Sequence, residues 1–254
     1  MSEKGLLIDV EKCIACHACS AACKVKNNTP GEAPWTKVES HEIGEFPNTK
    51  EYNLPFNRCM HCETPACDSV CLVHAFQKTS DGSVVYDRKK CIGCRYCMVA
   101  CPFNVPKFEW GKAVPFINKC NFCADRQAAK LQPACVSVCP TGALLFGERK
   151  KLLDIANTRI YQNPDRYVHH IYGEHEAGGT SLLYISTVPF EQLGFKAVGT
   201  TPYPQATWSF LSAVPLVLVL WPAFFGGIYA FTKRKEAVAQ AKAQEETKKE
   251  VRHG

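Results

Sequence analysis

Cysteine dominates the chemistry available to this chain of 254 residues. All 16 cysteines lie between positions 13 and 139, in four groups of four. The third group, CIGCRYCMVACP (residues 91–102), separates its cysteines by two, two and three residues and places a proline directly after the last. Closely spaced cysteines form disulfides, bind zinc or hold iron–sulfur clusters. The spacing has to decide among these three chemistries.

The spacing favours iron–sulfur clusters. The run Cys-x2-Cys-x2-Cys-x3-Cys-Pro is the bacterial ferredoxin signature for [4Fe–4S] clusters. Disulfide scaffolds are usually short secreted chains, whereas this sequence begins MSEKGLLIDVEKC, without an apolar signal segment. Zinc remains the main alternative, although a tetrahedral two-plus-two site does not require the third cysteine of these runs.

A crossing rule assigns the cysteines to clusters. In two-cluster ferredoxins the fourth cysteine of each run binds the other cluster. Applied here, the rule predicts four [4Fe–4S] clusters, with iron as the metal at every cysteine. The predicted ligands are Cys13, Cys16, Cys19 and Cys139 for cluster 1; Cys23, Cys120, Cys123 and Cys135 for cluster 2; Cys59, Cys62, Cys67 and Cys101 for cluster 3; and Cys71, Cys91, Cys94 and Cys97 for cluster 4.

Short strands and turns must position these cysteine loops. The segment GLLIDVEKC (residues 5–13) predicts a strand that leads into the first group, and Asp81-Gly82 predicts the turn of a β-hairpin. We therefore expect an α+β domain over residues 1–147, built of two interleaved ferredoxin-like modules with two [4Fe–4S] clusters each. The inner module (59–101) is inserted into the outer one (13–23 plus 120–139), and polar connections join the groups.

The segment that follows has no cysteine, and we expect residues 148–207 to form a docking extension. Its GEHEAGG stretch (residues 173–179) lacks the GK[ST] ending of a phosphate-binding loop. We find no nucleophile–base constellation and no flavin or nicotinamide fingerprint in the chain. These observations predict a non-catalytic protein without a substrate site of its own.

A C-terminal membrane span is predicted at residues 208–231, because these 24 positions carry no charge. A helix of that length measures about 36 Å, enough to cross a hydrocarbon core of about 30 Å. Trp208 and Tyr229 lie near its ends, where interfacial aromatic residues belong. A buried core helix is the alternative interpretation.

Charge flanking the predicted span indicates its orientation. The tail, residues 232–254, holds seven Lys/Arg against four Glu, whereas the 17 residues before Trp208 contain only one basic residue, Lys196. The positive-inside rule then places the tail in the cytoplasm and the cluster domain on the outer, periplasmic face of the inner membrane. The net charge of +6 is not concentrated as a nucleic-acid surface would require, so no nucleic-acid partner is expected.

Several side chains near the cysteines have two interpretations. Arg95, Lys119 and Lys24 are either ordinary surface charges or groups that raise a cluster potential. His17 and His61 lie inside cysteine loops that already have enough thiolates, so we expect them to pack or to form hydrogen bonds, with ligation as the alternative. His169, His170 and His175 are expected at a docking surface, with approach to a haem of a neighbouring subunit as the alternative.

The four groups resemble those of the iron–sulfur (beta) subunits of membrane-bound respiratory oxidoreductases, including formate dehydrogenase, hydrogenase-2 and dimethyl sulfoxide reductase. The likeness covers residues 13–139 and extends to residues 171–195 and the C-terminal span. Some relatives hold a three-iron cluster where the second cysteine of the third group is replaced, but Cys94 is present here.

The resemblance implies an electron-transfer role. The expected partners are a catalytic subunit, of the molybdopterin or nickel–iron type, and an integral membrane quinone-reactive or cytochrome b subunit. A formate dehydrogenase of the molybdenum or tungsten type is the first expectation for the catalytic partner, and a nickel–iron hydrogenase or a sulfur-compound reductase is the alternative. Lacking an export signal of its own, the subunit would be carried out folded by a partner's twin-arginine signal. A stand-alone membrane-tethered polyferredoxin is the second alternative, and a zinc-bound scaffold is the third.

Overall fold

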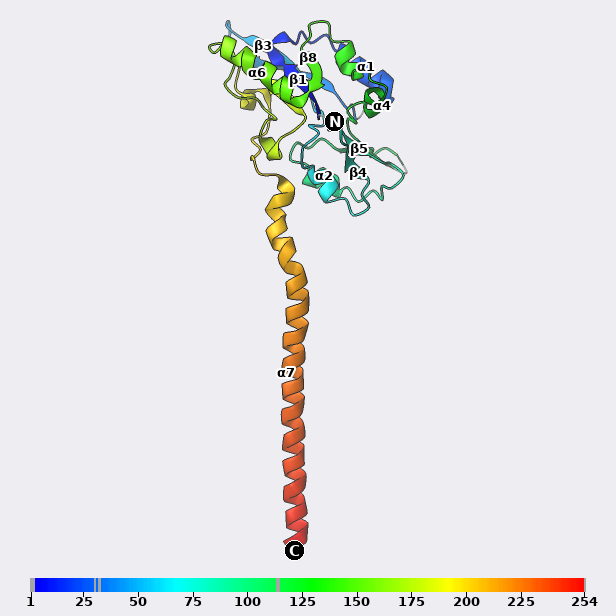
Figure 1. Ribbon diagram of the computed structural model, residues 1–254, viewed down its shortest axis with the longest axis vertical. Helices are drawn as coiled ribbons and strands as arrows, with labels where there is room; N and C mark the ends of the chain where they lie inside the picture. Colours follow the sequence, from blue (N-terminus) through cyan, green and yellow to red (C-terminus); the bar gives the residue numbers. More distant parts are fainter. Residues whose placement is uncertain (1–2, 30, 32, 113–114, 254) are drawn as a thin grey trace. The chain divides into compact units, whose positions relative to one another are not determined.

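The computed structural model describes residues 3–29, 31, 33–112 and 115–253. The chain divides into two compact units, Met1–Pro204 and Gln205–Gly254. The first unit contains all the cysteines together with the strands and short helices that position them. The second consists of the long C-terminal helix (Figure 1).

A three-stranded sheet forms the centre of the first unit. Strand β1 (Lys4–Asp9) lies between β8 (Leu144–Glu148), which is antiparallel to it, and β9 (Leu182–Ile185), which is parallel. The run Leu6-Leu7-Ile8 is completely buried, as expected for a strand that is covered on both faces. The predicted strand before Cys13 is thus present, and it is paired on both sides.

The two faces of this sheet have different coverings because side chains alternate along a strand. Leu7 and Leu183 face helix α6 (Arg149–Gln162), whose Leu152 and Ala156 pack against them; Figure 1 shows α6 lying along β1 and β8. Leu6, Ile8 and Tyr184 face the opposite way, toward Met60, Phe122 and the ligand candidates Cys19 and Cys135. One face of the sheet therefore supports the cysteine loops directly.

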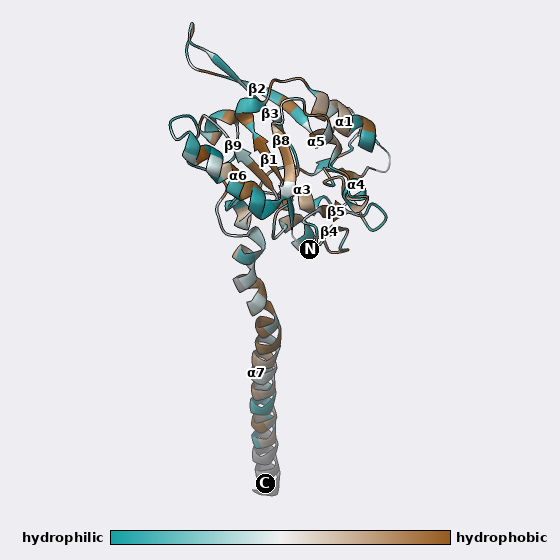
Figure 2. Cartoon of the chain, turned by 45° about the horizontal axis from the view of Figure 1, so that its top comes forward, coloured by the Kyte–Doolittle hydropathy of each residue, from teal (hydrophilic) through white to brown (hydrophobic). Residues whose placement is uncertain are grey.

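Within the described residues, three antiparallel strand pairs surround this core. The hairpin predicted around Asp81-Gly82 is confirmed as β4 (Phe76–Lys78) and β5 (Val84–Tyr86). Two further hairpins lie within the connections between cysteine groups: β2 (Lys37–Ile43) with β3 (Lys50–Phe56), and β6 (Lys107–Phe108) with β7 (Ile117–Asn118). The β2–β3 hairpin is mostly hydrophilic and projects from the unit (Figure 2), which explains why an apolar pattern did not predict it.

Short helices carry or adjoin most of the cysteines. Helix α1 packs against α5, and α2 packs against α3, so the first cysteine group lies beside the fourth and the second beside the third. The bounds of these and the remaining short elements are η1 Val10–Lys12, α1 Ala18–Asn27, α2 Ala66–Ser69, α3 Tyr96–Ala100, α4 Ala124–Ala128, α5 Ala134–Ser137, η2 Glu176–Gly178 and η3 Phe190–Leu193.

Residues 149–204 belong to the same compact unit as the cysteine loops. They contribute α6 and β9 to the central core, and the bond from the Ser181 amide to the Met60 carbonyl, 3.1 Å, joins them to the second cysteine group. Whatever surface this segment offers to a partner, it is also part of the framework that holds the loops.

The second unit is one apolar helix that continues into a polar tail. Helix α7 (Tyr203–His253) runs through both the predicted span and the predicted tail, with Pro215 and Pro222 inside it. The part Tyr203–Lys242 is long and apolar enough to cross a membrane by length and composition. Its apolar side chains are exposed, as Leu218 (68%) and Phe225 (56%) illustrate.

A buried carboxylate connects the end of β1 to α6 and to the residues that follow α6. The Asp9 carboxylate, fully buried, accepts hydrogen bonds from Arg159 Nη1 at 2.7 Å and from the Tyr167 hydroxyl at 3.2 Å. Burial, followed by the neighbouring Asp9 charge, raises the pKa of Tyr167 to about 12. The tyrosine therefore stays protonated and remains a donor to Asp9 at neutral pH.

We predict that Asp9→Asn destabilises the first unit. Removing the charge weakens the hydrogen bonds from Arg159 and Tyr167. The free energy of unfolding should fall by about 2–3 kcal/mol, as is typical for hydrogen bonds to a charged group. The melting temperature should then fall by roughly 4–12 °C for a unit of this size, as measured by circular dichroism. Lys151→Gln is the control, because the Lys151–Glu148 pair has a lysine side chain that is 72% exposed and such pairs contribute little. Equal shifts in the two variants would contradict the prediction.

Candidate iron–sulfur centres

The first predicted ligand set surrounds one small pocket. Cys13, Cys16, Cys19 and Cys139 all line it, together with Ile14 and Leu144. Burial raises the pKa of the Cys13 thiol, and the nearby Cys139 and Cys16 raise it further. Four thiols from two ends of the cysteine-rich region therefore converge on one space, as a cubane cluster requires.

The local backbone explains how three of these thiols reach the same pocket. Ala15 and His17 have φ values of 54° and 56°, a left-handed conformation that bends the chain sharply between Cys13 and Cys19. Helix α1 begins directly after His17 and carries Cys19 and Cys23 one turn apart. The third group repeats this geometry, since Gly93 and Arg95 have φ values of 72° and 62° and α3 follows.

The third predicted set also lines a single pocket. Cys59, Cys62, Cys67 and Cys101 surround it, with Lys119 and Pro102 among the other lining residues. Burial raises the pKa of Cys62 and of Cys67, and the thiols of the same set, Cys59 and Cys101, add to the effect. Lys119 opposes it at Cys67 by favouring the thiolate.

The second and fourth sets are brought together as well. At the second set, burial raises the pKa of Cys23, and Cys135 and Cys123 raise it further. At the fourth set, burial raises the pKa of Cys97 to about 12, with contributions from Cys91, Cys94 and Cys71. Each set is therefore close enough for its thiols to interact electrostatically.

The donor chemistry and its spacing fit a cluster larger than one ion. Every one of the 16 cysteines is described and has a free thiol. Within residues 3–29, 31, 33–112 and 115–253, no three His, Cys, Asp or Glu side chains lie close enough to hold a single metal ion. The thiols instead surround spaces, at two sets as defined pockets. Because ligand thiols must be deprotonated, those whose pKa burial raises, such as Cys67 and Cys97, would release protons when a positively charged core binds.

Backbone amides add hydrogen bonds to several sulfurs. The amide of Ala75 donates to Cys71 Sγ at 3.2 Å, that of Gly93 to Cys91 Sγ at 3.4 Å, and that of Phe122 to Cys120 Sγ at 3.3 Å. Hydrogen bonds to sulfur are among the factors that set the reduction potential of a cluster. The loops therefore hold the sulfurs and also bias their electronic environment.

The basic side chains near the sulfurs fall into two kinds. Lys119 is buried, and its ammonium donates to the carbonyl oxygens of Val84 and Cys120. Lys24 and Arg95 are exposed, and Arg95 lies over the ring of Trp110 at 5.0 Å. Of the three residues considered from the sequence, Lys119 is thus the one enclosed among the ligand candidates.

A fourth basic residue, Arg58, escaped the sequence analysis. Its side chain is buried, with 4% exposed, and its Nη2 donates to Cys135 Sγ at 2.9 Å. Although burial opposes the charged form, Cys135 and Cys120 raise the pKa of Arg58 above its usual value. Its position directly before Cys59 was the available signal, but it contacts a cysteine of another group that lies far along the chain.

The histidines in the cysteine loops have different environments. His61 is completely buried, accepts a hydrogen bond from the Val84 amide on Nδ1 at 2.9 Å and stacks on Phe122 with centroids 4.6 Å apart. His17 is exposed at the start of α1. His61 thus has the packing and hydrogen-bonding role expected for it, as an acceptor.

The three later histidines gather at the surface. His169, His170 and His175 line one open pocket of about 260 Å³, together with Tyr161 and Glu174. His170 Nε2 lies 2.7 Å from Glu176 Oε1. Their approach to a haem in a neighbouring subunit stays a prediction.

Comparisons with known proteins agree on the type of cofactor. A family profile described as "4Fe-4S dicluster domain" matches residues 51–149. A protein of Nitratidesulfovibrio vulgaris is 45% identical, over 97% of this chain and 71% of the relative. The hydrogenase-2 operon protein HybA of Escherichia coli O157:H7 is 35% identical, over 74% of this chain and 71% of the relative. The nitrate-inducible formate dehydrogenase iron–sulfur subunit of Escherichia coli K12 is 34% identical, over 72% of this chain and 68% of that subunit.

These similarities extend well beyond the cysteine spacing and cover most of both chains. Cysteine runs of the ferredoxin type, thiols gathered around small spaces and relatives of this kind all indicate the same chemistry. The cofactors are [4Fe–4S] clusters, and the 16 cysteines lie in motifs of the ferredoxin type. The chain belongs to the iron–sulfur subunit family of oxidoreductases that includes the subunits of formate dehydrogenase, hydrogenase-2 and dimethyl sulfoxide reductase.

Proposed function

We propose that this electron-transfer subunit conducts electrons through four [4Fe–4S] clusters, between a catalytic subunit and a quinone-linked membrane subunit of a respiratory complex. The observation that carries the proposal is that the ligand sets pack against one another in the order 1, 2, 3, 4. Cys19 of set 1 lies in the same packed cluster of side chains as Cys135 of set 2. Cys120 of set 2 shares another such cluster with Cys59 of set 3, and Cys67 of set 3 shares a third with Cys97 of set 4.

This order corresponds to two interleaved modules. Clusters 1 and 2 would belong to the outer module and clusters 3 and 4 to the inner one. The packing of α1 on α5 and of α2 on α3 supports that division, because each helix pair joins the two cysteine groups that share ligands. The link between the modules would then run from cluster 2 to cluster 3.

The first and the last cluster of the proposed series each have an exposed cysteine, which suits contact with partner subunits. Cys16 of set 1 and Cys94 of set 4 are exposed. Beside them lie exposed apolar side chains, Ile14 (61%) in one loop and Ile92 (63%) in the other. Clusters 2 and 3 have no exposed cysteine, so electrons would enter and leave through clusters 1 and 4.

We predict that alanine substitutions will show which cysteines bind the same cluster. Cys71→Ala and Cys94→Ala should abolish or alter the same signal in electron paramagnetic resonance of the reduced complex. Cys62→Ala should alter a different signal, although Cys62 and Cys71 belong to the same sequence group. Iron should fall from about 16 to about 12 per chain if the altered cluster is lost. A shared signal for Cys62→Ala and Cys71→Ala would overturn the crossing pattern.

The catalytic partner is proposed to be a molybdenum or tungsten enzyme of the formate dehydrogenase type. The named formate dehydrogenase subunit, at 34% identity, supports this choice. A nickel–iron hydrogenase is the second candidate, because the relative HybA is named for a hydrogenase-2 operon and matches at 35% identity. A sulfur-compound reductase follows, supported by the thiosulfate reductase electron transfer subunit PhsB of Salmonella typhi at 44% identity over 56% of this chain.

Metal analysis of the complex purified through this subunit separates these partners. We expect molybdenum or tungsten at about one atom for every 16 iron atoms of this chain, since four four-iron clusters accompany each catalytic subunit. Nickel in its place would establish the hydrogenase alternative. A monodisperse single chain without either metal, able to exchange electrons with several proteins, would favour the stand-alone polyferredoxin and contradict the proposal.

We also propose that the apolar part of α7 crosses the inner membrane and that the tail is cytoplasmic. The uncharged run at 208–231 and the basic residues that begin at Lys233 support this arrangement. The first unit, with its clusters, would lie on the periplasmic face, and the segment 148–207 would serve as a docking surface.

We predict that an epitope tag at the C-terminus will be protected in intact spheroplasts and become cleavable after permeabilisation. A tag inserted at the turn of the β2–β3 hairpin, between Gly44 and Thr49, should be cleaved in both preparations. This turn belongs to the first unit and lies at the tip of the projecting hairpin, with the whole of β3 between it and Cys59. Cleavage of the C-terminal tag in intact spheroplasts would reverse the proposed orientation.

A further inference from the structure

Arg58 is a buried cation among the ligand candidates, and its guanidinium donates to a cysteine sulfur. It lies two residues beyond the end of β3, directly before Cys59 of set 3, yet its guanidinium turns toward set 2. Its Nη2 donates to Cys135 Sγ at 2.9 Å, and only 4% of the residue is exposed. Cys19, Cys23 and Cys120 also lie within electrostatic range of it. One side chain thus adjoins sulfurs of the first and second sets.

No carboxylate balances this buried charge in the described part of the chain. None of the described ion pairs includes Arg58, whereas Arg159 Nη1 lies 2.7 Å from the buried carboxylate of Asp9. A guanidinium cannot be deprotonated in a protein, and an uncompensated buried charge is strongly destabilising. The thiolates of the adjoining clusters are the negative groups that can compensate it.

Two of the guanidinium nitrogens also lack hydrogen-bond acceptors. Nε and Nη1 of Arg58 are buried, and neither has a partner within the residues that the structure describes. Buried donors are normally satisfied, so these two call for acceptors supplied by something other than the polypeptide. A cluster held by Cys23, Cys120, Cys123 and Cys135 provides sulfur acceptors beside the one that Nη2 already contacts.

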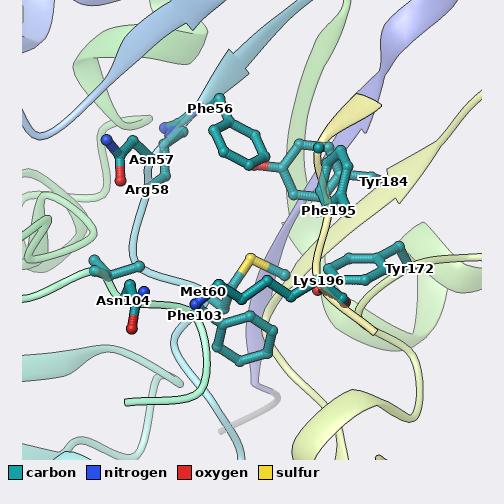
Figure 3. Close-up of a pocket in the computed structure, with 12 residues that line it drawn as sticks. Phe56, Asn57, Arg58, Met60, Phe103, Asn104, Tyr172, Tyr184, Phe195 and Lys196 are labelled. Atoms are coloured by element: carbon teal, nitrogen blue, oxygen red, sulfur yellow. Dashed lines mark hydrogen bonds between the residues drawn. The ribbon is translucent and has the colours of Figure 1, made fainter. Parts of the chain in front are cut away.

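Among the described residues, the pocket that Arg58 lines contains no carboxylate that could accept a hydrogen bond from it. Arg58 lines a pocket of about 220 Å³ whose other walls include Phe56, Met60, Phe103 and Phe195 (Figure 3). The hydroxyl of Tyr184, a further lining residue, donates to the Pro55 carbonyl, and Lys196 brings a second cation rather than an anion. Only 4% of Arg58 is exposed, so bulk water screens its charge little and its electrostatic effect is strengthened.

We propose that Arg58 raises the reduction potential of the cluster bound by Cys135. This cluster, one of the two in the middle of the series of four, would then hold the electron between transfer steps. The proposal rests on the electron-transfer function above. Each step moves one electron: the cluster gains it from one neighbouring cluster and loses it to the other. A fixed positive charge and hydrogen bonds to sulfur stabilise the reduced form, which carries one more negative charge than the oxidised form.

The test is a redox titration of the intact complex, followed by electron paramagnetic resonance, in the wild type, Arg58→Lys and Arg58→Gln. Lysine keeps the charge but loses the planar fork, and glutamine loses the charge. For the signal that Cys135→Ala removes, we expect midpoints in the order wild type, Arg58→Lys, Arg58→Gln, from highest to lowest. The fall in Arg58→Gln should reach a tenfold change in the reduction equilibrium, or about 59 mV for a one-electron couple. The other signals should move less.

Arg95→Gln is the matched control, because Arg95 also adjoins a ligand cysteine but is exposed. It should leave the midpoint of that signal unchanged. If Arg58→Gln does not retain its iron, the midpoint potential of Arg58→Lys is the test. A midpoint in Arg58→Lys equal to that of the wild type overturns the proposal. Equal shifts of all signals in Arg58→Gln, or any other order of the three midpoints, overturn it as well.

The cysteine substitutions keep this result separate from the proposed function. The titration follows the cluster that contains Cys135, whichever other cysteines bind it. If Cys23→Ala and Cys135→Ala altered different signals, the ligand sets would be wrong, while the effect of Arg58 on the Cys135 signal would still be measured. Conversely, correct sets with no shift in the Arg58 variants would reject the role of Arg58 alone.

Discussion

The convergence of cysteine thiols from distant parts of the chain is the constraint on which the rest of the structure depends. Cys139 meets the loop of Cys13, and Cys101 meets that of Cys59. Because a cubane core needs four thiolates around one small space, each fourth cysteine draws two stretches of chain together. The pairing of short helices and the crossing of loops are the geometric result, and little regular secondary structure is needed beyond it.

The central sheet makes this arrangement rigid without taking part in the chemistry. One of its faces is occupied by α6 in an ordinary apolar core, while the other touches the cysteine loops through Leu6, Ile8 and Tyr184. Buried thiols lie in the same apolar cluster as these side chains. The protein thus combines a hydrophobic core on one side with a core of sulfur and, once the cofactors are bound, iron on the other.

The features that follow from local spacing could be predicted, and those that depend on tertiary contacts could not. The cysteine runs, the strand before Cys13 and the hairpin at Asp81-Gly82 are all encoded within a few residues. The β2–β3 hairpin was missed because its strands are mostly polar and exposed. Arg58 was missed because its partner, Cys135, is 77 positions away in sequence, and no spacing rule connects a guanidinium to a thiol. The role of β9 in the central sheet depends likewise on a pairing with the opposite end of the unit.

The position of β1 between β8 and β9 has a consequence for the order in which the protein is made. The ribosome releases this strand first, but its two neighbours, which end at Glu148 and Ile185, emerge much later. The hairpin of β4 and β5, by contrast, is complete within one short stretch. The nascent chain therefore holds its first cysteine group without a finished scaffold until β9 has emerged. We expect iron to be inserted at this group only after Ile185 has been made, because one face of the completed sheet supports the loop.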